Sequence, residues 1–178
     1  REFFVDGIKT AQKAGEKYGR LDTLTGTKVA VEHSSPNLFK AFHIGHVMNN
    51  AVGESIVRLS EYAGAQVVRL SFPSDVSLGI GKAVWVLRQK YNDFKILTTD
   101  AERLAFIGDC YVEGTKVFEE SEDVQREVRD ITTMIYEQTS GEELDIYNVG
   151  KELTLRYFET MVGRLGSTFD AFIFETEA

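Results

Sequence analysis

Apolar and polar residues follow different periods along this 178-residue chain, and each period predicts a different element. Lys28–His33 alternates β-branched with polar or small residues, and Gln66–Phe72 is a second run rich in β-branched residues, so both are expected to be strands. Between them one apolar stripe indicates a helix that begins near His43 and stops at Gly64; its members are Val52, Ile56, Leu59 and Ala63. Strand, loop, helix and strand in this order predict a βαβ unit with parallel strands.

Helical spacing dominates the rest of the chain. Short helices are expected on either side of the βαβ unit, at residues 8–18 and 82–91. From residue 100 to 165 proline is absent, and the spacing predicts three helices, roughly 100–119, 121–138 and 143–165. Residues 169–174 return to a strand pattern. A helical block between strand-bearing segments predicts an α/β fold in which helices are inserted into a parallel sheet.

The same patterns divide the chain into four segments. We expect an N-terminal helix with its linker, a sheet-forming first half, a helical connective insertion and the start of the next strand, at residues 1–25, 26–97, 98–168 and 169–178. The chain opens partway through a helical pattern and ends as a strand begins, so we expect it to be a piece of a longer protein.

Composition narrows the class of protein. Apolar content of 43% and charged content of 27% are typical of a folded globular domain. The net charge of −8 argues against a DNA-binding or generally basic nucleic-acid coat protein. Residues 100–145 carry 14 acidic against 4 basic side chains, which favours a solvated acidic helical face. The single cysteine, Cys110, excludes an internal disulfide, and without a membrane-length apolar run or signal peptide we expect a cytoplasmic protein.

The loop Ser34–His46, SSPNLFKAFHIGH, carries the candidate chemistry. It holds two of the three histidines, and it leads from the carboxyl end of a parallel strand into a helix, which is where α/β sheets bind ligands. A helix start favours an anion, and His43 and His46 can donate hydrogen bonds to a phosphate as its charge grows. Lys40 adds a cation, and Gly45 leaves room for a flat ring against the backbone. Because no P-loop sequence occurs, these residues describe another kind of nucleotide triphosphate site.

Two simpler interpretations of the histidines remain open. They could be helix-start residues of no special role, or they could form a metal pair. Histidines at i and i+3 without a third ligand make a poor zinc site, so we expect no bound metal.

The sequence around this loop resembles a known family. His43-Ile44-Gly45-His46 has the form of the H-I-G-H nucleotide-binding motif of class I aminoacyl-tRNA synthetases. The longer stretch VEHSSPNLFKAFHIGHVMNNAVGES is similar to the arginyl-tRNA synthetases, in which a strand ending in Glu leads through Ser-Ser-Pro-Asn and a Lys to H-x-G-H. VVRLSFPSDVSLGIGK and YFETMVGRLGSTFDAFIFETE resemble that family's next strand and loop and the far end of its connective insertion. The resemblance implies a Rossmann-like parallel sheet with a helical insertion.

The chain departs from the family pattern near the loop. His33 stands where an aromatic residue is usual, Ala41 replaces a proline, and Met48 and Asn49 replace Arg and Ser. The second class I motif, Lys-Met-Ser-Lys-Ser, and a helical anticodon-binding domain do not occur in these 178 residues. The resemblance therefore implies the first half of a catalytic domain, which we expect to be inactive by itself.

The resemblance also implies a function and a set of residue roles. The full-length protein would be an arginine–tRNA ligase that activates L-arginine with ATP and Mg²⁺ and transfers it to tRNA. The roles implied for catalysis and ATP binding fall on His43, His46 and Lys40, with Gly45 also beside ATP. Those implied for arginine binding fall on Glu32, Ser34, Asn37, His46 and Asp75.

Other interpretations compete with these roles. Glu32 could be a strand-end carboxylate in water, and Ser34 and Ser35 could be ordinary turn residues. At the level of function, the chain could be a non-catalytic synthetase-like nucleotide-binding module, or a nucleotidyltransferase of the same superfamily, which also uses H-x-G-H on a βαβ unit. The Ser-Ser-Pro-Asn-x-x-Lys run before the histidines favours the synthetase.

Overall fold

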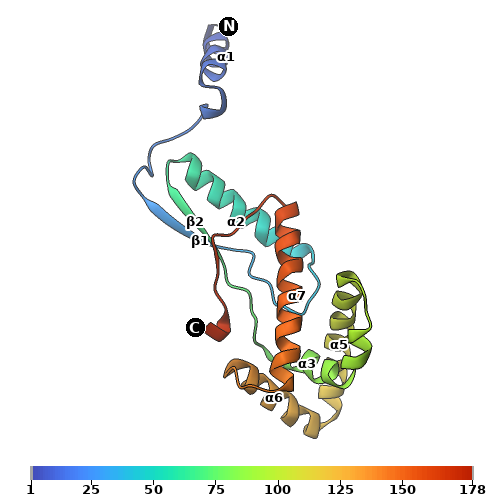
Figure 1. Cartoon of the computed structure of the whole chain (residues 1–178). Coiled ribbons are helices and arrows are strands. Elements are labelled where there is room, and N and C mark those ends of the chain that lie inside the picture. Colours follow the sequence, from blue (N-terminus) through green and yellow to red (C-terminus); the bar gives the residue numbers. More distant parts are fainter. Residues whose placement is uncertain (1, 178) are drawn as a thin grey trace.

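Three strands form a small parallel sheet in the computed structural model, which describes residues 2–177 (Figure 1). Their order across the sheet is β1-β2-β3, and they span Lys28–Glu32, Gln66–Ser71 and Ala171–Phe172. Lys28 lies opposite Gln66, and Leu70 lies opposite Ala171. The predicted parallel pairing of the first two strands is confirmed, whereas the last strand is shorter than the predicted run of 169–174.

Helix α2 (Ile44–Tyr62) connects β1 to β2 and packs on both strands. It ends where Gly64 takes a positive φ of 97°, as the sequence predicted. The apolar stripe that predicted this helix faces solvent: Val52 is 54% exposed and Leu59 is 70% exposed. The buried side of α2 instead carries two polar residues, a glycine and one apolar residue: Asn50, Glu54, Gly53 and Val57.

A close approach of helix to strand explains this choice of face. A Cβ at Gly53 would lie 2.3 Å from the Cβ and Cγ of His33, which follows β1. Only a residue without a side chain lets the helix backbone come so near. The sequence period located α2 correctly, but the contact with His33 decides which face is buried.

Five helices form a separate helical layer beyond the carboxyl ends of β1 and β2 (Figure 1). They are α3 (Leu78–Gln89), α4 (Tyr91–Lys95), α5 (Asp100–Glu120), α6 (Glu122–Tyr136) and α7 (Glu142–Arg164). The three helices predicted between residues 100 and 165 are confirmed as α5, α6 and α7. The predicted helix 82–91 begins earlier, because Ser77 caps it by accepting a hydrogen bond from the Ile80 N–H at 3.2 Å.

The hydrophobic core lies mainly within this helical layer. Helix α3 packs against α5, α6 and α7, and its buried residues join one apolar cluster with those of the other helices. Leu38 and Phe39 enter the same cluster from the loop after β1. By packing, α3 and α4 therefore join α5, α6 and α7, although both lie within the predicted segment 26–97.

The acidic residues of 100–145 lie on α5, α6 and the start of α7. Many are exposed, and some pair with basic residues around α3. Arg88 Nη1 lies 2.6 Å from Glu143 Oε1, and Lys90 Nζ lies 2.6 Å from Glu113 Oε2. Some of the acidic side chains on α5 and α7 thus form ion pairs with basic residues at the end of α3.

The N-terminal helix α1 (Glu2–Ala14) extends away from the rest of the chain (Figure 1). It has no buried residue, and a 3₁₀ turn, Gly15–Lys17, follows it. The helix predicted at 8–18 therefore begins and ends earlier than expected. Arg1 and Ala178, the outer ends of the predicted segments 1–25 and 169–178, lie outside the described residues. Among residues 2–177, no helix combines the length and apolar character needed to cross a membrane.

Candidate functional site

The loop Ser34–His43 leaves the carboxyl end of β1 and runs beside the loop that leaves β2. Asn37 and Ser74 form a parallel β-bridge between the two loops. The Leu38 N–H donates to the Ser74 carbonyl at 3.0 Å, and the Ser74 N–H donates to the Pro36 carbonyl at 2.9 Å. The two loops therefore form one unit at the edge of the sheet where α/β proteins bind ligands.

Two apolar side chains anchor this unit in the helical layer. Leu38 and Phe39 are buried, whereas their neighbours Asn37 and Lys40 are exposed. Phe39 has a positive φ of 63°, and its ring enters a space left by Gly150 on α7. The anchored pair holds the two polar side chains toward solvent, where a ligand can reach them.

The two histidines cap helix α2 together. The His43 Nδ1 accepts from the Gly45 N–H at 3.1 Å, and the His46 Nδ1 accepts from the His43 N–H at 3.2 Å. Their rings stack with centroids 3.8 Å apart and planes inclined by 19°. Serine or threonine with glutamate usually makes such a reciprocal cap, and here two imidazoles do so.

This capping determines which ring nitrogens can act on a ligand. Because each Nδ1 accepts a backbone hydrogen bond, we assign the proton of each neutral ring to Nε2. Partial burial lowers the pKa of His46, and the charges of His43 and Lys40 lower it further, so His46 is neutral near pH 7. Two Nε2–H donors thus stand at the positive end of the α2 dipole, an arrangement that suits a phosphate.

Gly45 has a different neighbour from the one expected. The sequence analysis predicted that a flat ligand ring could lie against its backbone. A Cβ at Gly45 would lie 3.0 Å from His43 Cε1, so the imidazole of His43 itself occupies this space. Gly45 therefore serves the cap, because a side chain there would press on the ring that accepts its N–H.

The two serines after β1 differ in burial and in their hydrogen-bond partners. Ser34 is buried with a φ of 56°, and its hydroxyl accepts from Asn50 Nδ2 at 3.0 Å. Ser35 donates to the carboxylate of Glu32 and accepts from the Phe72 N–H at 2.9 Å. Glu32 is exposed and remains available to a cationic group. Ser34 was expected to contact arginine. In the structure it is buried, and its hydroxyl bonds to Asn50 of α2.

Sequence reasoning missed the buried polar network beneath Ser34. Asn50 Oδ1 accepts from the Ser167 hydroxyl at 3.1 Å, and His33 Nδ1 lies 2.9 Å from the Ser34 hydroxyl. Burial lowers the pKa of His33, which favours its neutral ring in this network. The only sequence signal was an asparagine on the side of α2 opposite the apolar stripe.

Asp75 also differs from its expected role. It is 0% exposed, and its carboxylate accepts from Lys151 Nζ at 2.6 Å and from the Tyr147 hydroxyl at 3.0 Å. The Thr176 hydroxyl donates to the same oxygen at 2.6 Å. These donors enclose the Asp75 carboxylate and leave no part of it exposed for a substrate to reach. The chain offered one signal, a tyrosine and a lysine one helical turn apart on α7.

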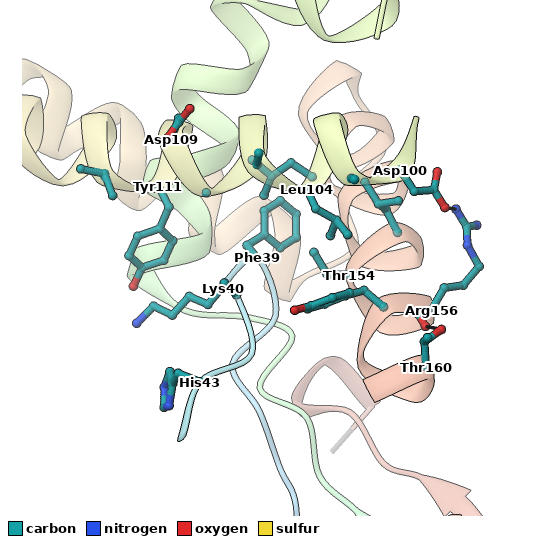
Figure 2. A pocket seen from close by; sticks show the side chains of 18 residues that line it. Phe39, Lys40, His43, Asp100, Leu104, Asp109, Tyr111, Thr154, Arg156 and Thr160 are labelled. Atoms are coloured by element: carbon teal, nitrogen blue, oxygen red, sulfur yellow. Dashed lines mark hydrogen bonds and ion pairs between the residues drawn. The ribbon is translucent and has the colours of Figure 1, made fainter. Parts of the chain in front are cut away.

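A cavity of about 1100 Å³ opens between α5 and α7, beside the loop Ser34–His46, which we call the histidine loop (Figure 2). Lys40 and His43 lie at one end, where Lys40 Nζ sits 4.6 Å from the centre of the Tyr111 ring. Apolar side chains, among them Phe39 and Leu104, line its middle. Apolar surface next to cationic and hydrogen-bonding groups suits a nucleotide better than a bare ion.

Metal ligands do not gather in the part of the chain that the structure describes. Within residues 2–177 no group of three or more His, Cys, Asp or Glu side chains could hold a metal ion. Of the predicted site residues, the structure brings Lys40, His43 and His46 together, since the two rings stack and the charges of His43 and Lys40 act on the pKa of His46. Glu32 lies at the end of β1, and Asn37 lies in the loop that follows it.

Comparison with known proteins identifies the family of this chain. A family model described as tRNA synthetases class I (R), catalytic domain, matches residues 8–175. The arginine–tRNA ligase of Treponema denticola is 31% identical over 172 residues, covering 93% of this chain and 28% of that protein. The arginine–tRNA ligase of Treponema pallidum subsp. pallidum is 30% identical over 164 residues, covering 92% of this chain and 28% of that protein.

A solved structure shows the same fold. The arginyl-tRNA synthetase of Thermus thermophilus superposes with a TM-score of 0.63 at 22% identity, over 95% of this chain and 27% of that chain. The chain thus spans less than a third of the length of the relatives that it matches.

Proposed function

Because the chain belongs to the family of class I arginyl-tRNA synthetase catalytic domains, we propose that its histidine loop takes part in arginine activation by the full-length protein. In this reaction the arginine carboxylate attacks the α-phosphate of ATP, arginyl-adenylate forms and pyrophosphate leaves. The 3′-terminal hydroxyl of tRNA then attacks the arginyl carbonyl, and AMP leaves. The reciprocal histidine cap of α2 carries this proposal, since it presents two Nε2–H donors beside a helix N-terminus.

The histidine side of the site would act on the phosphates. As the carboxylate oxygen approaches phosphorus, negative charge grows on the phosphate oxygens, and donors fixed in advance stabilise it without reorganising. His43 and His46 are such donors, because each ring is held by a backbone bond and by stacking on the other. Lys40 would add a positive charge on the same loop.

The strand side of the site would bind the amino acid. Asn37 is exposed and is held between Pro36 and Leu38, whose backbones both bond to Ser74. Its amide can donate and accept, which suits an ammonium and carboxylate head group. Glu32, at the end of β1, would bind a positive group of arginine through a charge-assisted bond.

The remaining substrates follow from the reaction. We propose that Mg²⁺ arrives on the ATP phosphates, which hold this ion in many nucleotide sites. The tRNA acceptor end would approach the same loop, and the full-length protein would act in the cytoplasm, where ATP, arginine and tRNA meet.

Calorimetry with the purified chain tests the proposal. We expect weak binding of Mg–ATP and of a non-hydrolysable arginyl-adenylate analogue, and a loss of about tenfold or more in affinity for the analogue in His46→Ala and in Asn37→Ala. Asn92→Ala, at an exposed position on α4, is the matched control and should bind like wild type. Equal affinities in all four proteins would remove the loop from the site. Binding of ATP without preference for the arginyl group would favour the nucleotidyltransferase alternative.

A further inference from the structure

Asp75 joins three segments that lie far apart in the sequence. It belongs to the loop after β2, Tyr147 and Lys151 belong to α7, and Thr176 belongs to the segment after β3. Besides its hydroxyl bond, Thr176 donates its backbone N–H to the second carboxylate oxygen of Asp75 at 3.2 Å. One buried carboxylate therefore receives four hydrogen bonds, which define what we call the Asp75 hub.

The contacts of the Asp75 hub compensate the charge of its buried carboxylate. An unpaired buried carboxylate is costly, but a carboxylate with a cation and three further donors is compensated. Lys151 is itself enclosed, with its Nζ 4.0 Å from the centre of the Phe174 ring. Burial alone would raise the pKa of Asp75, but the bonds from Lys151 and Thr176 outweigh it and leave the pKa below its ordinary value.

The hub connects directly to the loop that carries Asn37. Ser74, the residue before Asp75, bonds through its backbone to Pro36 and Leu38 on either side of Asn37. The Ser74 hydroxyl also donates to Glu175 Oε2 at 3.1 Å, beside the Thr176 contact. A shift of Asp75 would therefore move Ser74, and with it the backbone on both sides of Asn37.

We propose that Asp75 is a positioning residue: it fixes Asn37 for the amino acid substrate by locking the β2 loop to α7 and to the segment after β3. This role rests on the proposed function of Asn37 in arginine binding. It replaces the expected direct contact of Asp75 with substrate, which its burial prevents. The histidine cap lies outside this chain of contacts, because its bonds are local to the start of α2.

That separation distinguishes positioning from general stability. If Asp75 only stabilised the fold, its loss would weaken ATP and arginyl-adenylate binding alike. If it positions Asn37, Asp75→Asn should lower affinity for the adenylate analogue by about tenfold while Mg–ATP affinity changes less than about twofold. Asp93→Asn, an exposed aspartate on α4, is the matched control.

Amide hydrogen exchange measures the same role without any ligand. In Asp75→Asn we expect the Leu38 and Ser74 amides, which bond across the two loops, to exchange at least about tenfold faster. The His33 amide, which bonds to the Leu70 carbonyl between β1 and β2, should keep its wild-type rate. Equal protection of Leu38 and Ser74 in variant and wild type would overturn the proposal.

Further variants keep the test decisive if Asp75→Asn does not fold. Thr176→Val and Tyr147→Phe each remove one hydroxyl donor from the hub, and both should show the same selective pattern to a smaller degree. Uniform acceleration of all amides, or equal loss of both ligands, would assign the hub to stability alone. If wild type binds no adenylate analogue, the proposed function fails, and the exchange rates still decide whether the hub holds the loop.

Discussion

The His43 ring accepts a hydrogen bond from the Gly45 N–H, and the His46 ring accepts one from the His43 N–H. Neither ring can therefore turn without breaking its hydrogen bond. The free nitrogen of each ring then has a fixed position, and the lowered pKa of His46 keeps that ring neutral near pH 7. Because the pKa of His46 is lowered by burial and by its cationic neighbours, an incoming phosphate has a specific effect: its negative charge favours the imidazolium.

This electrostatic coupling predicts a pH dependence of ATP binding. The pKa of free His46 lies below the ordinary value of histidine, and bound phosphate would raise it, so binding at mildly acidic pH takes up a proton. We expect affinity for ATP to rise by up to about tenfold from pH 7.5 to 5.5 beyond the rise seen in His46→Gln. Titration calorimetry in buffers of different ionisation enthalpy measures the uptake. ATP's own protonation is common to both proteins, so identical profiles would show that His46 does not face the phosphates.

The positions of some candidate site residues could be predicted from the sequence, and the burial of others could not. Lys40, His43 and His46 lie where the loop pattern placed them, because a strand exit and a helix start are local features. Ser34 and Asp75 are buried instead. Two partners that enclose Asp75, Lys151 and Thr176, are 76 and 101 positions away in the sequence, and no local pattern predicts such contacts.

At the scale of the element, the anchored loop depends on one glycine of α7. A Cβ at Gly150 would lie 2.4 Å from the ring of Phe39. We expect Gly150→Ala to displace Phe39 and to destabilise the chain by about 1–3 kcal/mol, although alanine favours a helix. Chemical denaturation followed by circular dichroism measures the free energy of unfolding.

Gly163, on the same helix, gives the matched control. A Cβ there meets nothing within 4 Å, so Gly163→Ala should be neutral or stabilising by up to about 1 kcal/mol. A stabilised Gly150→Ala variant would mean that Phe39 does not occupy this space in solution.

Helix α2 shows what periodicity can and cannot predict about an element. The apolar spacing located the helix and its end at Gly64, because a 3.6-residue period is a property of the helix itself. The buried face was not predictable, since it depends on the close fit of Gly53 against His33 from another element. The exposed stripe shows that apolar spacing alone does not identify a buried side.

At the scale of the molecule, the chain brings only one side of the proposed reaction centre. It spans less than a third of its relatives, and the Lys-Met-Ser-Lys-Ser motif does not occur in it. The resemblance to class I synthetases implies that this motif supplies donors to the other side of the triphosphate, and losing one preorganised donor typically costs about 100- to 1,000-fold in rate. We therefore expect no tRNA charging by the 178-residue chain in an aminoacylation assay with arginine, ATP and tRNA.

The charge of the molecule supports the same expectation. The net charge of −8 and the acidic helices α5 and α6 disfavour capture of tRNA, which depends on neutralising its phosphates. Slow arginine-dependent pyrophosphate exchange without charging would agree with a half site. Charging near the rate of a full-length relative would contradict both the proposed division of labour and the role of the missing motif.

The fit of Phe39 into the space beside Gly150 also has an evolutionary consequence. A ring on the loop and the lack of a side chain on α7 together fill one volume, so neither position can change freely while the other stays the same. Across related sequences we expect the two positions to covary: a smaller residue at 39 where 150 bears a side chain, and a large ring at 39 where 150 is glycine. The packing of Phe39 against Gly150 would thus be detectable as paired substitutions at positions 39 and 150 in related sequences.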